Sequence, residues 1–592
     1  MKWALLLGRL SGGIVVLLAL VAAGCSARIG ERSNTTSLPE RITPAASKPG
    51  LPAPDPTAGD HVAFTDVTSR SGIRWRHFSG ARGKKFMPES ESAGCAFLDY
   101  DGDGRPDILL LNDAEWPGEK TGRRQTHLAL YHNEGNGLFK DVTRGSGLDI
   151  EMYAMGVAVG DYDNDGREDL YITCVLGSSH LFHNDGNGHF TDVTKQAGVE
   201  NAGRWGTSCA WVDYDRDGKL DLVIGNYCRW TPATDVICRD KDGHKTYCTP
   251  TVYRGEPARL YHNEGNGRFR DVTERAGLTN PPGKTLGVAI LDYDDDGWPD
   301  IALANDTEPN CLFHNEHDGT FKEVGLAAGV ALPDSGVPRA GMGIDAGDID
   351  NSGRPSLLIS NFSGEGFSLF QNQGGSLFRD AGADWGVHAA SLQRMGWGLF
   401  FFDYDLDGHL DALAVTGHLY PEVARYHPDL TYAEPPLLFH NTGRRFEDVS
   451  AGHGADLSRP LVGRGAAYAD IDGDGDLDVL LTANDGAPRL LRNDGGNRNH
   501  WLRITTVGTK SNRDGIGAKL VLEAGSLKQT RWVQSGSSYL SASERTITFG
   551  LGSAARVDQL TITWPSGQID HYAHPRADQV LIAREGVSKT GD

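Results

Sequence analysis

The 592-residue sequence is short of basic side chains and of long amphipathic helical patterns. Its 57 lysines and arginines stand against 79 aspartates and glutamates, which gives a formal net charge of −22. This deficit of positive charge argues against binding to nucleic acid and against electrostatic docking onto an anionic membrane. The missing helical periodicity, together with 76 glycines, favours many short strands and turns. We therefore predict an all-β chain that is too long for one ordinary core.

The sequence also lacks the usual motifs of catalysis and nucleotide binding. It contains no GxSxG, Walker loop or HExxH, and its closely spaced carboxylates occur in one type of repeated loop. These absences leave the sequence without a convincing active site, so we predict no catalytic residues.

The first 25 residues have the pattern of an export signal. Lys2 and Arg9 precede an apolar run over residues 14–23, which is too short to span a membrane. The ending VAAGC resembles a bacterial lipobox, which implies cleavage before Cys25 and lipid attachment to Cys25. Residues 26–60 are rich in Pro, Ser and Thr and are predicted to form a disordered tether. We expect an exported lipoprotein at the outer membrane or cell surface, held in the membrane by its lipid alone.

A nine-residue acidic pattern, DxDxDGxxD, recurs along the chain. Six copies are complete, and a seventh has Ser352 and Ser356 in place of aspartates. The copies begin at Asp99, Asp161, Asp213, Asp292, Asp348, Asp403 and Asp470. Each copy is followed by an apolar run of strand composition. Along the chain, the acidic loops alternate with strands that end in Asn and with Phe-x-acidic elements. Repeats of roughly 50 to 80 residues with about four strand signals are typical of propeller blades. We predict a seven-bladed β-propeller over residues 61–494, closed by pairing of its two ends in one blade.

The spacing of the carboxylates is that of a calcium-binding loop. Ca²⁺ takes six to eight oxygen ligands, and positions one, three, five and nine with the carbonyl of position seven can surround one ion. The glycine at position six permits the sharp bend, and an apolar residue at position twelve excludes an EF-hand. The alternative is an Asp/Gly turn that binds no ion. This alternative is strongest for the loop at Asp348, because serines replace two of its aspartates.

The predicted ligands of about six structural Ca²⁺ ions, with a partial set at Asp348, follow in loop order. They are Asp99, Asp101, Asp103, Arg105 and Asp107; Asp161, Asp163, Asp165, Arg167 and Asp169; Asp213, Asp215, Asp217, Lys219 and Asp221; Asp292, Asp294, Asp296, Trp298 and Asp300; Asp348 and Asp350; Asp403, Asp405, Asp407, His409 and Asp411; and Asp470, Asp472, Asp474, Asp476 and Asp478.

The loops resemble those of the integrin α-subunit propeller and the FG-GAP/VCBS repeat class. This resemblance implies structural ions that brace the outer hairpins of the blades. After Asn493 the words SNRDGIGAK, SGSSYLS, FGLG and WPSG resemble the ASPIC/UnbV domain, here residues 495–585 with a tail at 586–592. We expect this domain to be a small β-sandwich or barrel. The combination resembles the cartilage acidic protein family, although the EGF-like module of its vertebrate members has no counterpart here.

An insertion over residues 228–258 carries three cysteines. Relatives in the resembling family have a similar cysteine pair, and we favour a disulfide between Cys238 and Cys248. A zinc site that adds Cys228 and His244 lacks CxxC spacing.

Five histidines occupy the same place in successive repeats. They cannot converge on one ion, so we interpret them as ordinary strand residues. They are His132, His183, His262, His314 and His440.

Two classes of function remain open. A surface-tethered binding, adhesion or scaffold module would use the longer insertions, at about residues 111–128, 228–258 and 416–436, to hold a protein or glycan. Candidate contact aromatics are Trp230, Tyr420, Tyr426 and Tyr432. The alternative is a polysaccharide-modifying or biosynthetic enzyme, which needs acids converging on the central channel, whereas we expect the repeated aspartates in peripheral loops.

Overall fold

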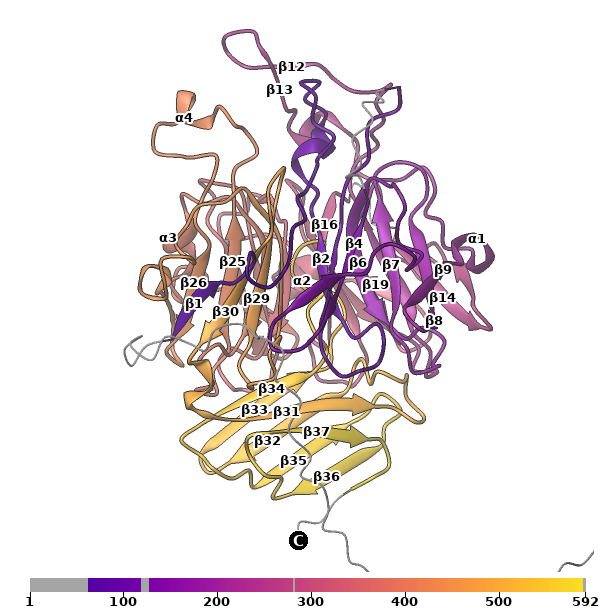
Figure 1. Ribbon diagram of the computed structural model, residues 1–592, viewed down its shortest axis with the longest axis vertical. Coiled ribbons are helices and arrows are strands. Elements are labelled where there is room, and N and C mark those ends of the chain that lie inside the picture. Colours follow the sequence, from indigo (N-terminus) through magenta and orange to yellow (C-terminus); the bar gives the residue numbers. More distant parts are fainter. Residues whose placement is uncertain (1–61, 119–126, 280–282, 589–592) are drawn as a thin grey trace, which may run out of the picture. The chain divides into compact units, whose positions relative to one another are not determined.

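The computed structural model describes residues 62–118, 127–279 and 283–588. The predicted signal peptide, the tether and Cys25 lie outside these residues. Strands dominate the described chain, so the all-β prediction is confirmed (Figure 1). Within the described ranges, none of the helices has both the length and the apolar character needed to cross a bilayer.

Seven four-stranded antiparallel sheets form the propeller within the described residues. In order from the first to the last strand, the blades are β2 (Cys95–Leu98), β3 (Asp107–Leu110), β4 (Ala129–Asn133) and β5 (Phe139–Asp141); β6 (Ala154–Gly160), β7 (Asp169–Cys174), β8 (His180–Gly186) and β9 (His189–Asp192); β10 (Gly206–Val212), β11 (Asp221–Asn226), β14 (Arg259–Gly265) and β15 (Arg268–Asp271); β16 (Thr285–Leu291), β17 (Asp300–Asn305), β18 (Cys311–Asn315) and β19 (Phe321–Glu323); β20 (Ile344–Gly347), β21 (Ser356–Ile359), β22 (Ser368–Gly374) and β23 (Leu377–Asp380); β24 (Gly396–Phe402), β25 (Asp411–Thr416), β26 (Leu437–Asn441) and β27 (Phe446–Asp448); and β28 (Gly463–Ala469), β29 (Asp478–Ala483), β30 (Arg489–Asp494) and β1 (Ala63–Asp66).

The helical segments are short and lie in the connections. They are α1 (Thr194–Ala197), α2 (Gly325–Ala328), α3 (Val387–Ser391) and α4 (Val423–Tyr426), with 3-10 turns at Met87–Ser90, Pro250–Val252, Ser450–Gly452 and Gly496–Arg498. A small hairpin of β12 (Cys238–Arg239) and β13 (Lys245–Thr246) projects from the third blade (Figure 1).

The first strands of neighbouring blades pack against one another around the ring, and β28 returns to β2. The ring closes because β1 pairs with β30, as the order of sequence elements predicts. In this closing blade Phe64 lies opposite Asn493, and in the first blade Phe139 lies opposite Asn133. The Phe-x-acidic element and the Asn strand are therefore register partners.

The apolar run after each acidic loop becomes the second strand of its blade. Every residue of β7 and of β11 is buried, because adjacent blades cover both faces of the sheet. A strand covered on both faces reads as a continuous apolar run and loses the alternation of a half-exposed strand.

The C-terminal domain is a two-sheet sandwich. One sheet has the order β34 (Ile547–Gly552), β31 (His500–Val507) and β37 (Gln579–Arg584). The other has the order β33 (Leu527–Trp532), β32 (Lys519–Ala524), β35 (Gln559–Thr563) and β36 (Ile569–Ala573). Alternate residues of β32 are buried, which is the pattern of a strand with one covered face.

The loop between β33 and β34 leaves the sandwich and enters the centre of the propeller. We call residues 533–546 the plug. It hydrogen-bonds to first strands from four blades: Ala542 bonds with Cys95 and Phe97 of β2, Leu540 with Ser208 of β10, Ser538 with Ile344 of β20 and with Ala466 of β28. The SGSSYLS segment, residues 535–541, therefore fills the central channel of the propeller.

Tyr539 is the largest side chain of the plug, and it is fully buried. Its ring lies 5.0 Å from that of Trp397 in β24, and its hydroxyl donates to the backbone oxygen of Glu91 at 2.6 Å. The ring and the hydroxyl both join the plug to the propeller, so the two domains share one core.

We expect Tyr539→Ala to lower the free energy of unfolding by about 3–5 kcal/mol, the usual cost of emptying a large aromatic site. Tyr539→Phe keeps the ring and should cost about 1 kcal/mol. Leu326→Ala, at an exposed position, serves as the control with an effect below about 0.5 kcal/mol. Denaturant unfolding measures all three, and a wild-type value for Tyr539→Ala contradicts the shared core.

Candidate functional site

The acidic loops connect the first and second strands of each blade, so the expectation of outer hairpins and peripheral loops is wrong. They face the C-terminal domain. Arg503 of β31 lies 2.5 Å from Asp470 in the seventh loop, and the amide of Asp161 in the second loop donates to Asp514 at 2.8 Å. The loops therefore lie at the junction of the two domains.

The aspartate at position one shapes each loop. In the first loop, Asp99 accepts the amides of Asp103 at 3.0 Å and Gly104 at 2.9 Å. Gly104 has φ +82°, and the glycine at position six has positive φ in all seven loops. This left-handed conformation explains the glycine, because other residues adopt it at a cost.

The aspartate at position nine ties the loop to its blade. Asp107 accepts the amide of Tyr100 at 3.2 Å and that of Asn133 at 2.7 Å. The side chain of Asn133 then donates to the backbone oxygen of Ile471, in the loop of the preceding blade, at 2.9 Å. The same bond, at 2.8–2.9 Å, recurs at Asn184, Asn263, Asn315, Asn372, Asn441 and Asn493. These seven asparagines form a ring of bonds between loops that sequence reasoning missed.

Side chains at position seven turn back toward position five. Arg105, Arg167 and Lys219 form ion pairs with Asp103, Asp165 and Asp217 respectively. In the fourth loop, Trp298 stacks on His317, whose Nε2 lies 2.6 Å from Asp296. Part of the negative charge of the loops is thus balanced by neighbouring side chains.

The five repeat histidines each contact the loop of their own blade. They do not converge on one ion, as predicted, but they are more than ordinary strand residues. Their Nδ1 atoms lie 3.1–3.3 Å from the position-nine carboxylate and 3.4–3.7 Å from that at position three. A His-Asn dipeptide at the end of the third strand in five of the seven blades was the available signal.

Burial raises the pKa values of many loop carboxylates. The pKa of Asp107 rises to about 8 through burial, and that of Asp161 rises to about 8 through burial and the nearby Asp514 charge. Burial and the Asp221 carboxylate raise the pKa of Asp213 to about 8. Ionising such groups costs folding free energy at neutral pH unless positive charge is near.

Several buried carboxylate oxygens in the loops have no hydrogen-bond partner. They are Oδ1 of Asp213, Asp215, Asp294, Asp472 and Asp476. Unpaired buried oxygens are costly, and hard divalent cations prefer oxygen ligands. The donor set of these loops therefore fits a cation of the calcium type.

The fifth loop satisfies its carboxylates without a cation. Gln371 stands in the place of the repeat histidine and donates to Asp350 at 2.9 Å, while Ser356 accepts the amide of Asn372 at 3.1 Å. The two serine substitutions thus coincide with a loop that has fewer carboxylates and whose Asp350 is hydrogen-bonded by a side chain.

Arginines of the C-terminal domain supply positive charge to the loops. Arg503 pairs with Asp470 and Glu544, and Arg545 pairs with Glu168 at 2.6 Å. Burial lowers the pKa of Arg531, and the charges of Asp403 and Asp348 oppose that shift. Breaking a buried pair of this kind costs about 3–5 kcal/mol, so the docked domain depends on them.

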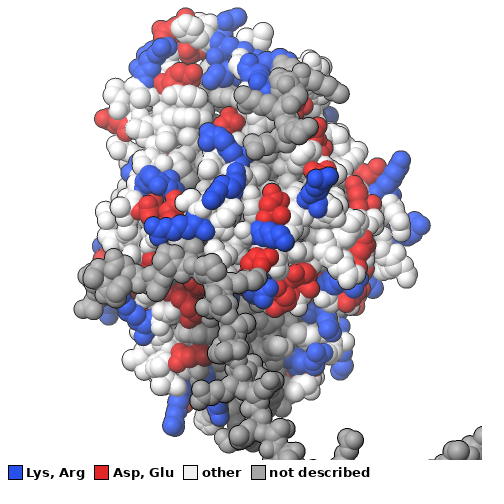
Figure 2. All heavy atoms as spheres, in the orientation of Figure 1, with Lys and Arg blue, Asp and Glu red and all other residues white. Residues whose placement is uncertain are grey.

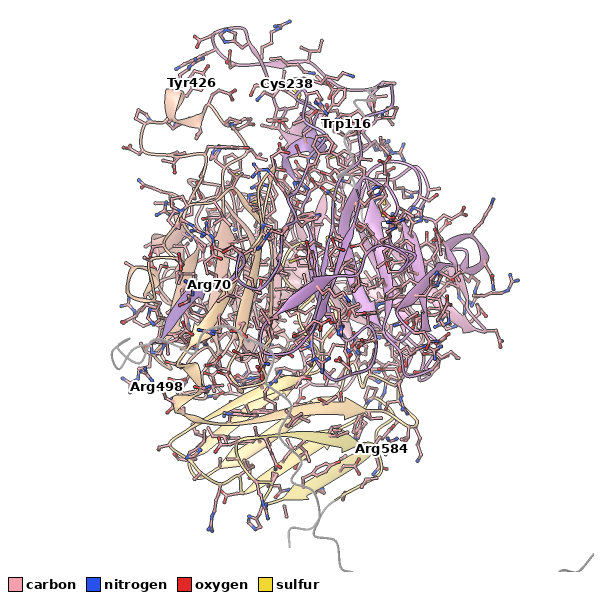
Figure 3. The ribbon with its side chains drawn as sticks, viewed as in Figure 1. Arg70, Trp116, Cys238, Tyr426, Arg498 and Arg584 are labelled. Carbon is pink, nitrogen blue, oxygen red and sulfur yellow. A yellow bond between two sulfur atoms is a disulfide. The ribbon has the colours of Figure 1, made fainter. Side chains whose placement is uncertain are left out.

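A cleft of about 1010 Å³ lies between the β12–β13 hairpin and the insertion that contains α4. Figure 3 shows Cys238 and Tyr426 at the end of the propeller that lies away from Arg584 of the C-terminal domain. The lining includes Phe362, Ser363, His418, Tyr420, Val423 and Tyr426. The cleft is therefore built by two of the insertions that the sequence singled out.

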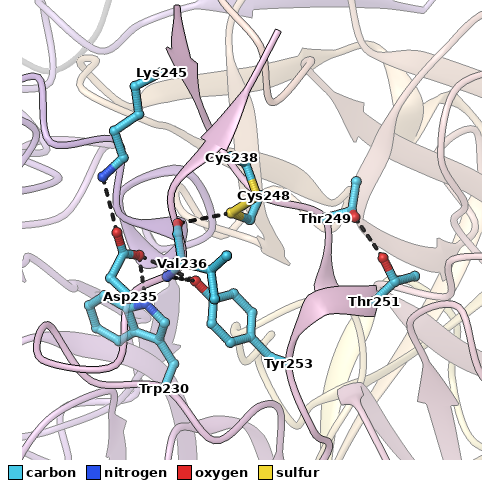
Figure 4. Close-up of a disulfide and its surroundings, with 9 residues drawn as sticks. All are labelled: Trp230, Asp235, Val236, Cys238, Lys245, Cys248, Thr249, Thr251 and Tyr253. Carbon is cyan, nitrogen blue, oxygen red and sulfur yellow. Dashed lines mark hydrogen bonds and ion pairs between the residues drawn. A yellow bond between two sulfur atoms is a disulfide. The ribbon is translucent and has the colours of Figure 1, made fainter. Parts of the chain in front are cut away.

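A disulfide between Cys238 and Cys248 braces the hairpin, and this bond excludes the alternative zinc site (Figure 4). Asp235 beside it accepts from Trp230 at 3.0 Å and pairs with Lys245 at 3.0 Å. The hairpin reaches the other insertion through Tyr426, whose hydroxyl donates to Asp240 at 2.7 Å.

Among the predicted contact aromatics, the prediction for Trp230 is wrong, because this side chain does not line the cleft. It is only 4% exposed and packs on Phe86 and Trp116, each at 5.4 Å between ring centroids. Tyr420 and Tyr426 do line the cleft, while Tyr432 is half-buried beside it. Trp230 therefore packs the core of the insertion and is not available to contact a ligand.

Ser363 and His418 meet in the cleft, with Oγ and Nε2 3.3 Å apart. The Nδ1 atom of His418 accepts the amide of Tyr420 at 3.1 Å, so the proton resides on Nε2. Burial lowers the pKa of His418 to about 4. A neutral imidazole that donates to Ser363 cannot take its proton, so this pair is not arranged as a nucleophile and base.

Lysine, arginine, aspartate and glutamate side chains lie intermixed on the face in Figure 2. In the cleft, Lys245 pairs with Asp235, Lys85 with Glu422, and Arg425 lies 4.0 Å from Asp242. These pairs balance part of the charge that lines the cleft.

Comparison with known proteins agrees with the fold. The sequence matches the FG-GAP-like repeat family over residues 99–172, 173–224, 233–303 and 292–359, and the ASPIC and UnbV family over residues 508–590. The chain belongs to the FG-GAP repeat proteins that carry an ASPIC/UnbV domain.

More particularly, it is homologous to cartilage acidic protein 1. The Homo sapiens protein is 27% identical over 450 residues, 71% of this chain and 61% of the relative, so the chain spans less than two thirds of its length. The Mus musculus protein is 26% identical over 518 residues, 81% of this chain and 72% of the relative.

Two solved structures share a general likeness. An Agrocybe aegerita lectin is 15% identical, with a TM-score of 0.35, over 66% of this chain and 85% of its own. The exotype rhamnogalacturonan lyase YesX is 13% identical, with a TM-score of 0.34, over 68% of this chain and 72% of its own. Scores this low carry no argument about function.

Proposed function

We propose that the chain is a calcium-stabilised binding or scaffold module of the cell envelope, tethered by a lipid on Cys25. The observation that carries the binding function is the cleft between the disulfide hairpin and the α4 insertion. It lies at the far ends of the second strands, away from the acidic loops: β25 begins at Asp411 and ends two residues before His418. The C-terminal domain covers the other end, and the plug fills the channel.

Calcium is the proposed occupant of the six complete loops. Unpartnered oxygens and raised carboxylate pKa values support it, because a bound cation relieves both. One ion at a hundredfold excess over its Kd adds about 2.7 kcal/mol to stability. Several such sites would hold the ring and the docked domain together.

We expect Ca²⁺ to raise the melting temperature of the EGTA-treated protein. Asp213→Asn removes a buried ligand and should make this rise smaller, because the free energy of one bound ion, about 2.7 kcal/mol at a hundredfold excess of Ca²⁺ over its Kd, is lost. Asp348→Asn, in the loop with two serines, is the matched control and should leave the rise unchanged. Equal melting with Ca²⁺ and EGTA, and no bound metal, would establish the ion-free turn instead.

The lipid anchor follows from the VAAGC sequence alone. We expect mass spectrometry of the mature protein to find an acylated Cys25 at the N-terminus, and Cys25→Ser to move the protein from the membrane fraction to the soluble fraction. An unmodified cysteine in a membrane-bound protein contradicts this anchor.

The ligand is proposed to be a glycan or a protein of the envelope. We expect a glycan array or envelope extract to yield selective capture, weakened at least tenfold by Phe362→Ala, which corresponds to about 1.4 kcal/mol. Val337→Ala, at an exposed position outside the cleft, should bind normally. Capture that is insensitive to Phe362 contradicts the cleft, and chemical change of a captured glycan would establish the enzyme alternative.

A further inference from the structure

The repeat histidines add a nitrogen atom to loops otherwise built from oxygen donors. In the first, second and fourth loops, the ligand atoms of the histidine and of positions three and five all lie within 4.8 Å of one another. The third loop brings together Asp215, Asp221 and His262 in the same way. Atoms this close can all contact one ion at metal–ligand distances of about 2.0–2.4 Å.

The third loop shows most clearly that these atoms are free to bind an ion. Asp213 is 4% exposed, and its Oδ1 atom has no hydrogen-bond partner. Oδ1 of Asp215 and Nδ1 of His262 are likewise buried without a partner. Nδ1 of His262 lies 3.1 Å from Asp221, yet without the alignment of a hydrogen bond. Three donor atoms without a hydrogen-bond partner therefore lie together at this loop.

We propose that His132, His183, His262, His314 and His440 are metal ligands, and that their loops take a first-row transition dication, Mn²⁺, as well as Ca²⁺. This rests on the cation loops of the proposed function. Imidazole favours transition ions, whereas Mn²⁺ also accepts the carboxylates that suit Ca²⁺. One imidazole among several carboxylates gives Mn²⁺ a ligand that Ca²⁺ does not need.

The two remaining blades provide a contrast within the same chain. Gln371 occupies the histidine position of the fifth blade and bonds to Asp350. Arg492 occupies it in the seventh blade, where it pairs with Asp494 at 2.8 Å. An arginine cannot ligate a cation, and the fifth loop lacks two carboxylates. The five histidine blades are thus the Mn²⁺ sites.

The test is a titration of the metal-free full chain with MnCl₂, followed by calorimetry and pulsed electron paramagnetic resonance. We expect directly bound ¹⁴N coupled to the Mn²⁺ spin in the wild type. A variant with all five histidines changed to Gln should lose this coupling and bind Mn²⁺ at least tenfold more weakly, with its Ca²⁺ affinity changed less than threefold. Gln is the residue that the fifth blade already carries.

Single variants keep the test decisive if the fivefold variant fails to fold. His262→Gln should remove about one fifth of the ¹⁴N-coupled Mn²⁺, while Gln371→Ala, in the blade without a histidine, should remove none. Wild-type Mn²⁺ without ¹⁴N coupling, or Mn²⁺ affinity unchanged in the Gln variants, overturns the proposal even where Ca²⁺ binds. Absence of both Ca²⁺ and Mn²⁺ binding overturns the cation loops themselves.

Discussion

The ring depends on one repeated hydrogen bond, from an asparagine side chain of each blade to the loop of the blade before it. Asn184, for example, donates to the backbone oxygen of Tyr100 at 2.8 Å, while its own amide binds Asp169. Each acidic loop is therefore held both by its own blade and by the next one. A distortion in one loop is transmitted to two sheets, which explains why loop and asparagine recur together.

This arrangement concentrates negative charge where the blades meet the C-terminal domain, and the fold must neutralise it. Three sources of positive charge reach the loops: side chains at position seven such as Arg105, arginines such as Arg503 from the sandwich, and the proposed cations. The first two leave oxygens such as Oδ1 of Asp213 unpaired. Side chains alone therefore do not complete the balance of charge at the loops.

The sequence predicted the repeating part of the molecule because each motif acts within its own blade. The loop, the strand after it and the Phe–Asn register are local, and even ring closure followed from their order. What it missed lies between distant segments. The plug reaches Cys95 from Ala542, Trp230 is buried by Phe86, and His262 meets Asp221 only after the sheet forms. Spacing in the chain carries no information about such contacts, although the His-Asn pair that five of the seven repeats share marked the contact of His262 with Asp221.

The second strand of a blade joins the acidic loop at one end of the propeller to the connections at the other end. In the sixth blade, β25 starts at Asp411 in the acidic loop and ends at Thr416 beside the cleft, five residues further on or about 17 Å away. All six residues are buried, so the strand is rigid and the loop fixes where the insertion begins. Metal at one end would thus position the ligand cleft at the other without touching it.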